Sequence, residues 1–119
     1  MQSIGQSVQA TVHTQETVDG KQGYRPVQAG YAHSNTLDSE FHLYSLIWTE
    51  HKIETLFDNK TFFTYEKTKN ATWDNWPFDQ PFYLIMNVAI GGLWGGEVDQ
   101  AIFPKRMEVD YVRYYQKIK

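Results

Sequence analysis

Apolar and polar residues alternate along much of this chain, and no stretch sustains the period of about 3.6 residues that marks an amphipathic helix. The first alternating segment spans residues 8–14. Its valine and alanine side chains occupy one face, and Gln9, Thr11 and His13 occupy the other. This pattern predicts a strand with one apolar and one polar face.

Residues 15–40 are rich in Gly, Gln and Ser, and we interpret them as a functional loop or an irregular cover rather than a simple hairpin. Segments 41–48, 52–57 and 61–65 are predicted strands because aromatic and β-branched residues recur in them. Asp58, Asn59 and Lys60 separate the last two segments, and Asp and Asn tolerate a positive φ at a tight turn. The three segments therefore predict an antiparallel meander.

Two further strands are predicted, an apolar one at residues 82–89 and one at residues 106–115 near the end of the chain. No internal repeat, low-complexity stretch or linker divides the sequence, so we treat residues 1–119 as one domain. The overall pattern predicts an all-β protein, either a β-sandwich or part of one. The aromatic residues predicted to lie in its core are Trp48, Phe57, Phe62 and Tyr83.

The composition narrows the class of protein. With 119 residues and 41% hydrophobic residues, the chain is long enough for one domain with a core. Its net charge of −3 comes from interspersed acidic and basic residues, which indicates neither a nucleic-acid partner nor an anionic membrane. The absence of cysteine excludes disulfides and thiolate metal sites, and we expect no signal peptide within this chain.

Residues 76–92 contain an aromatic turn followed by an apolar segment with a single amide, Asn87. Glycines on both sides of Trp94 would let a loop present its indole to solvent. A pyranose ring stacks on aromatic rings and needs hydrogen bonds for its hydroxyls, so this pattern favours a sugar-binding cleft. The alternative is that the aromatic residues fill a β core and that a neighbouring group satisfies the amide.

Catalytic motifs are scarce. Hydrolysis of a glycosidic bond usually needs two carboxyl groups that flank it. The pairs Glu97 with Asp99 and Glu108 with Asp110 are not favoured for this role, because neither is joined by a third acid at the expected spacing. His13 shares a polar face with hydroxyl and amide groups, but a lone histidine is more often a surface residue. The remaining histidines have no zinc-site spacing, and no nucleophilic serine elbow or phosphate loop is present.

Several segments together resemble glycoside hydrolase family 16, and they are most similar to its laminarinases. They occur in the family's order and spacing, but the chain corresponds only to about the C-terminal half of the family domain. The resemblance implies a concanavalin-like jelly-roll β-sandwich, of which this chain is a part, with an open cleft for β-1,3 or mixed-linkage glucans. The segments that carry the resemblance are residues 11–14, 41–49, 76–79, 82–92 and 109–115.

In that family a catalytic strand of the form Glu-x-Asp-x-x-Glu lies just before the segment that resembles residues 8–14, so the resemblance implies no catalytic residue in this chain. It implies substrate contacts for His13, Asn87 and Trp94. It also implies that Asp110 is one ligand of a structural calcium whose other ligands lie elsewhere, with no cofactor required for catalysis. Because polymeric glucans lie outside most cells, it further implies an extracellular or periplasmic protein.

Three interpretations remain open. The chain is the C-terminal part of a retaining endo-β-1,3(-1,4)-glucanase and contributes cleft residues. Alternatively, it is a non-catalytic β-glucan-binding module, or a half-fold that assembles with the missing N-terminal half or with itself. Uncovered sheet edges and apolar faces favour pairing with another chain in the last case.

Overall fold

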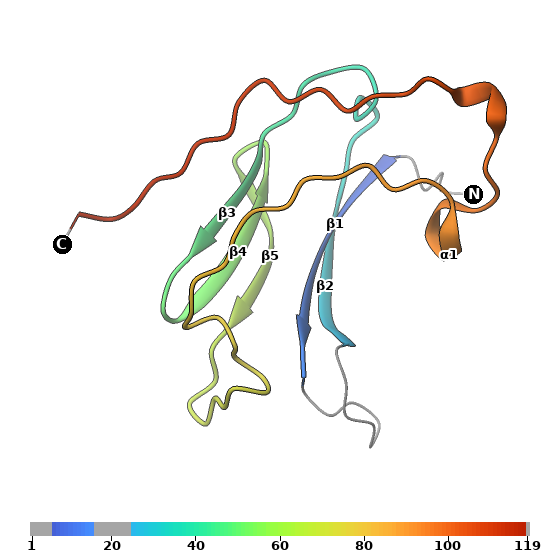
Figure 1. Ribbon diagram of the computed structural model, residues 1–119. Helices are drawn as coiled ribbons and strands as arrows, with labels where there is room; N and C mark the ends of the chain where they lie inside the picture. Colours follow the sequence, from blue (N-terminus) through green and yellow to red (C-terminus); the bar gives the residue numbers. More distant parts are fainter. Residues whose placement is uncertain (1–5, 16–24, 119) are drawn as a thin grey trace. The chain divides into compact units, whose positions relative to one another are not determined.

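The computed structural model describes residues 6–15 and 25–118, and in this part β-strands are the main regular structure (Figure 1). Its strands form two antiparallel sheets, one with the order β1-β2 and one with the order β3-β4-β5. A four-residue helical turn and a three-residue 3-10 turn follow the strands. The elements are β1 (Ser7–Thr14), β2 (Arg25–His33), β3 (Tyr44–Trp48), β4 (Lys52–Phe57), β5 (Lys60–Glu66), α1 (Gly92–Gly95) and η2 (Gln100–Ile102).

The chain divides into two compact units, Met1–Pro81 and Phe82–Lys119, which we describe separately. All five strands belong to the first unit, and both turns belong to the second. In the part of the chain that the structure describes, no helix has the length and apolar character needed to cross a membrane.

The predicted meander of the first unit is confirmed. β4 has the predicted bounds, β5 is one residue longer at each end, and β3 begins at Tyr44 rather than at residue 41. Asp58 and Asn59 adopt φ values of 47° and 66° at the turn between β4 and β5. These positive values are the ones that Asp and Asn tolerate best among residues with a side chain, which explains why the turn could be predicted.

The prediction of a loop over residues 15–40 is wrong in part, because it contains β2. Pro26 and Gly30 weaken the strand pattern of this segment, since proline donates no ladder hydrogen bond and glycine has no side chain to pack. In the structure β2 nevertheless pairs antiparallel with β1 along almost its whole length. A Cβ at Gly30 would lie 2.6 Å from the Cβ of Phe63, so glycine permits the close approach of β2 to β5.

The core of the first unit lies between the two sheets and under residues 72–79. Phe57 is buried as predicted, but Phe62 is only half-buried, and its neighbour Phe63 takes the core position on β5. Trp48 is 42% exposed and Tyr83 is 84% exposed, so their predicted core positions are wrong. Trp48 ends β3, and Tyr83 lies in a segment without a strand partner. The buried apolar side chains are Val12, Ile53, Phe57, Phe63 and Trp76.

The two strands predicted at residues 82–89 and 106–115 are not formed in the described second unit, where both segments run without a strand assignment. A strand requires a neighbouring ladder to receive its hydrogen bonds, and no described residue provides one here. Large apolar side chains therefore stay exposed, including Leu84 and Ile85 at 67% and 68%. Gly91, Gly92 and Gly96 adopt φ values of 72°, 84° and 71° around α1, which confirms that the glycines shape this loop.

Candidate functional site

The outward face of the β1-β2 sheet carries the polar side chains that were predicted to share one face. Gln9 and His13 are exposed, whereas Val12 and Thr14 are buried on the opposite face, which lies against β5 at Gly30. The alternation along β1 thus separates a packed face from a face on which Gln9 and His13 are open to solvent. Gln9 Nε2 donates a hydrogen bond of 2.9 Å to Thr11 Oγ1 on the open face.

β2 adds an aromatic residue to this face. Tyr31 is paired with Gln9 and is 54% exposed, and Ala29 is paired with Thr11. Because partners in an antiparallel pair project to the same side, Tyr31 and Ala29 belong to the open face. At the far end a bulge between Val12 and His13 shifts the register, and His13 is paired with Pro26. The described members of the open face are Ser7, Gln9, Thr11 and His13 on β1 and Ala29, Tyr31 and His33 on β2.

Sequence analysis missed Tyr31 because it lay in the segment interpreted as loop. In the structure, exposed Ala29, Tyr31 and His33 alternate with the less exposed Gly30 and Ala32, but the residue types alone do not show it. Small residues at 29, 30 and 32 hid this alternation, because they contribute little hydrophobic contrast.

The other predicted site residues lie in the second unit. Asn87 is exposed in the extended segment after Pro81, and Asp110 is exposed in the extended segment near the end of the chain. Trp94 lies in α1, and its side chain is outside the described set. His13 belongs to the first unit, and Asn87, Trp94 and Asp110 belong to the second.

The acidic residues of the second unit do not assemble into a site. Among the described residues, no group of three or more His, Asp or Glu side chains could hold a metal ion. Calcium in proteins takes about six to eight oxygen ligands, so Asp110 alone does not make a calcium site. Asp99 Oδ1 accepts a hydrogen bond of 2.9 Å from the amide of Ala101 at η2, and Glu108 lies 2.7 Å from Arg106. Two members of the disfavoured acidic pairs thus have local partners.

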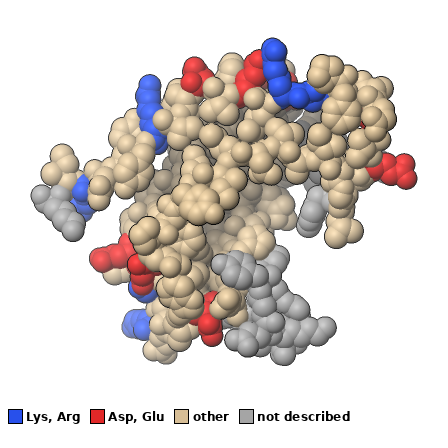
Figure 2. All heavy atoms as spheres, in the orientation of Figure 1, with Lys and Arg blue, Asp and Glu red and all other residues tan. Residues whose placement is uncertain are grey.

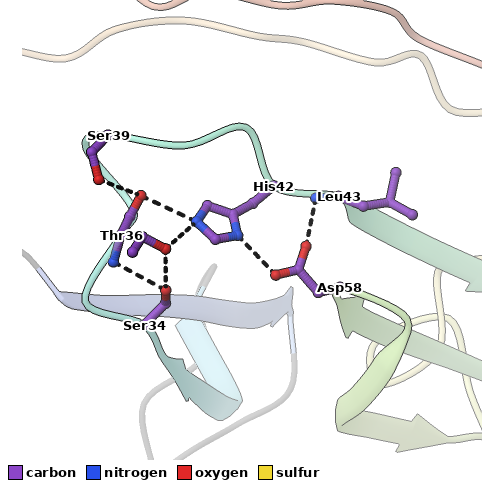
Figure 3. A network of polar contacts seen from close by, with 6 residues as sticks. All are labelled: Ser34, Thr36, Ser39, His42, Leu43 and Asp58. Atoms are coloured by element: carbon purple, nitrogen blue, oxygen red, sulfur yellow. Dashed lines mark hydrogen bonds and ion pairs between the residues drawn. The ribbon is translucent and has the colours of Figure 1, made fainter.

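A second polar cluster, which no sequence motif indicated, is centred on His42 (Figure 3). His42 Nδ1 lies 2.8 Å from Asp58 Oδ2, and Nε2 lies 3.1 Å from the carbonyl oxygen of Thr36. Asp58 Oδ1 also accepts a hydrogen bond of 2.9 Å from the amide of Leu43. Since the carboxylate and the carbonyl only accept hydrogen bonds, both ring nitrogens donate when the imidazole is protonated.

This cluster favours the charged form of both partners. The hydrogen bond with Asp58 raises the pKa of His42, and the hydrogen bond from the Leu43 amide, together with that from His42, lowers the pKa of Asp58. The His42 side chain is 8% exposed and its ring lies 4.9 Å from that of Phe57. We interpret the cluster as a structural clamp between the segment after β2 and the turn between β4 and β5.

The aromatic turn at residues 76–79 is also structural. Trp76 is only 3% exposed, stacks on Tyr65 at 5.7 Å between ring centroids, and donates a 3.0 Å hydrogen bond from Nε1 to Asp79 Oδ1. Lys67 lies over the Trp76 ring and pairs with Asp79 Oδ2. The hydrogen bonds from Lys67 and Trp76 lower the pKa of Asp79. These contacts hold the turn in the core, so Trp76 is not available to stack on a sugar.

Neither positive nor negative side chains dominate the visible surface of the molecule. On the face drawn in Figure 2, basic and acidic side chains are interspersed, and most of the surface is neither. This distribution agrees with the net charge of −3 and with a neutral partner rather than a polyanion.

The chain is similar to known carbohydrate-active proteins. The model of the family described as Glycosyl hydrolases family 16 matches residues 2–113. A beta-glucanase of Rhodothermus marinus is 41% identical over 90 residues, which are 71% of this chain and 32% of that protein. A keratan-sulfate endo-1,4-beta-galactosidase of Sphingobacterium multivorum is 42% identical over 82 residues, which are 69% of this chain and 19% of that protein.

A solved structure confirms the fold class. The crystal structure of laminarinase from Flavobacterium sp. UMI-01 matches with a TM-score of 0.70 and 37% identity, covering 82% of this chain and 40% of that one. The chain therefore spans about a third or less of the curated relatives named above, and less than half of the solved laminarinase. The family resemblance and the all-β sandwich class expected from the sequence are both confirmed. The chain belongs to glycoside hydrolase family 16.

Proposed function

We propose that this chain contributes part of the glucan-binding surface of a retaining endo-β-1,3(-1,4)-glucanase. The observation that carries the proposal is the open face of β1-β2, which exposes Gln9 and His13, with the half-buried Thr11 between them, while its other face is packed. Similarity to a beta-glucanase and to a laminarinase supports a β-glucan as the ligand.

The chemistry of this face suits a neutral sugar. Each hydroxyl of a pyranose both donates and accepts hydrogen bonds, and an amide, a hydroxyl and a neutral imidazole each supply both functions. In this proposal His13 binds and orients the sugar near the cleavage point, a contribution that lowers the barrier by positioning rather than by covalent chemistry. Asn87 and Trp94 are proposed as further substrate contacts from the second unit.

Catalysis in the retaining mechanism needs two carboxyl groups about 5 to 5.5 Å apart, one as nucleophile and the other as acid and then base. We propose that both acids come from a Glu-x-Asp-x-x-Glu strand outside this chain. No described acidic residue lies on the open face of β1-β2, which agrees with a binding role there. The chain alone is thus proposed to bind glucan without cleaving it.

The test measures laminarin binding by calorimetry and reducing-sugar release by the same purified chain. We expect binding, no turnover and weaker binding by His13→Ala. His51→Ala is the matched control, because His51 is an exposed histidine at the turn between β3 and β4. Turnover by the chain alone, or equal effects of the two substitutions, would contradict the assignment. Keratan sulfate and a mixed-linkage glucan, run beside laminarin, define the class of polysaccharide.

A second candidate function is assembly with another chain, and the exposed apolar side chains of the second unit favour it. Leu84, Ile85 and Val112 are each more than half exposed in extended segments that lack a strand partner. Such segments can add to the sheet edge of another chain. We expect light scattering to show a dimer or larger species that dissociates on dilution, whereas a monomer at high concentration would contradict this candidate.

A further inference from the structure

We propose that Tyr31 is a sugar-stacking residue, and that it holds a different sugar unit of the glucan from the one that contacts His13. The inference rests on the proposed glucan-binding function and deepens it. Tyr31 lies on β2, which the sequence had not predicted as a strand, and no comparison assigns it a role.

Tyr31 is positioned to offer its ring to a ligand. It is paired with Gln9 and remains 54% exposed, although its neighbours Gly30 and Ala32 are turned toward the packed face. A tyrosine beside the hydrogen-bonding side chain of Gln9 combines an apolar ring with a polar partner. This is the combination that a pyranose requires, since its C–H face is apolar and its edge is lined with hydroxyls.

The open face is long enough for more than one sugar unit. Gln9 and His13 are separated by four residues of β1, which corresponds to about 13 Å at about 3.3 Å per residue. Tyr31 and His13 thus lie near opposite ends of a strip longer than one pyranose ring. Between them the described members of the face are Thr11 and the small residue Ala29, and neither side chain is bulky enough to interrupt the strip. An oligosaccharide therefore fits this strip better than a single sugar.

The residues around Tyr31 also bear on the charge of the ligand. Gln9, Thr11, Ala29 and Tyr31 are all uncharged, and none can form an ion pair with a sulfate group. The histidines His13 and His33 also belong to the open face, but its described members include no Lys or Arg, so the face favours a neutral glucan over a sulfated glycan such as keratan sulfate. This selection distinguishes the face from one built on Arg or Lys, which would favour the anionic polymer.

The experiment measures the affinity of the full chain for a size series of laminari-oligosaccharides by calorimetry. For Tyr31→Ala we expect a loss of about 5- to 150-fold on the longer oligosaccharides, taking sugar stacking as comparable to base stacking on an aromatic ring. The shortest oligosaccharide that still reaches His13 should bind with unchanged affinity. Tyr31→Phe and Tyr31→Trp should retain the preference for longer ligands. Tyr114→Ala is the control, because Tyr114 is an exposed tyrosine of the second unit.

The outcomes separate this inference from the proposed function. If the unmodified chain binds laminarin and Tyr31→Ala keeps the full dependence on ligand length, the stacking role is overturned and the proposed function stands. If Tyr31→Phe loses as much affinity as Tyr31→Ala, the hydroxyl rather than the ring binds the sugar, and stacking is again overturned. If the unmodified chain binds no glucan, the proposed function fails and the role of Tyr31 fails with it. Unchanged binding of the shortest oligosaccharide by Tyr31→Ala shows that the variant is folded.

Discussion

The two units of this chain have similar sequence patterns but different structures. Apolar side chains alternate or cluster in residues 52–57 and 61–65, which form paired strands. Residues 82–89 and 106–115 show comparable patterns but are not assigned as strands. The difference lies in the partner, because β4 is flanked by β3 and β5 and the segments of the second unit have no ladder among the described residues. Patterning therefore marks a segment as suited to a strand, and a neighbouring backbone decides whether the strand forms.

The sharpest test of this contrast compares a buried and an exposed aromatic residue. Trp76→Ala removes a side chain that is 3% exposed together with its hydrogen bond to Asp79, and we expect it to lower the free energy of unfolding by about 3 to 5 kcal/mol. Tyr83→Ala, at a position that is 84% exposed, should change it by less than about 0.5 kcal/mol. Urea denaturation measures both. Similar effects at the two positions would mean that the second unit is packed in solution.

Substitution of one glycine in each unit tests the difference in packing between the two units. Gly30→Ala would bring its Cβ within 2.6 Å of the Phe63 side chain, and overpacking of this kind typically costs about 1 to 3 kcal/mol. Gly95→Ala meets no atom within 4 Å and lies in α1, where alanine is favoured over glycine by about 0.5 to 1 kcal/mol. We therefore expect Gly30→Ala to lower the Tm and Gly95→Ala to leave it unchanged or raise it, as measured by thermal unfolding. A neutral Gly30→Ala would contradict the close approach of β2 and β5.

The clamp of His42 and Asp58 makes the stability of the first unit depend on pH. The pKa of His42 is raised on folding, so its contribution is complete below the ordinary value of 6.5 and is lost as the pH rises through the folded pKa. The pKa of Asp58 is lowered on folding, so its contribution is present above the ordinary value of 3.8 and is lost as the pH falls through the folded pKa. Stability from this pair is therefore greatest between about pH 4 and 6.5.

The pH dependence is checked by the Tm of the chain from pH 3 to 9. We expect His42→Gln to remove the decline of Tm above pH 6.5, and Asp58→Asn to remove both that decline and part of the acid decline. Glu40 and Lys60 also act on the pair, since Glu40 raises the pKa of His42 and Lys60 lowers that of Asp58. His51→Gln serves as the control, because the His51 side chain is 79% exposed and lies 3.0 Å from the equally exposed Glu50. An unaltered profile in His42→Gln would contradict the clamp.

The smallest effect is expected for calcium. Because Asp110 is exposed and has no described cluster of acidic partners, we expect EDTA or added calcium to leave the Tm of this chain unchanged. Asp110→Asn should likewise alter the free energy of unfolding by less than about 0.5 kcal/mol. A calcium-dependent rise in Tm that Asp110→Asn abolishes would show that the second unit does assemble a metal site.

Local pattern accounts for what could be predicted. The two faces of β1 and the meander followed from alternation, and the Asp58-Asn59 turn followed from the backbone preference of its residues. β2 could not be predicted, because the reason for Gly30 is the distant Phe63, which no local pattern reveals. His42 and Asp58 are likewise 16 residues apart, and only the fold brings them together.

In the candidate site, too, local pattern predicts some residues and only the fold reveals others. The exposure of His13 followed from the alternation of β1, whereas Tyr31 depended on the pairing of β1 with the unpredicted β2. The residue pattern and the family resemblance both indicate Asn87 and Trp94 as sugar contacts, whereas the resemblance alone indicates Asp110 as a calcium ligand. All three roles stay predictions.

The turn at Asp58 and Asn59 also has a kinetic consequence. It joins β4 and β5 with the shortest connection between any two strands, and hairpins of this kind close in about 1 to 10 μs. β1 and β2 are joined by a longer segment, and their sheet meets the meander through contacts between residues far apart in the chain, such as Gly30 and Phe63. Because the entropy of closing a loop rises with its length, the meander is the natural folding nucleus. The β1-β2 sheet is then the later structure, and it is ordered against a meander that carries none of the proposed sugar contacts itself.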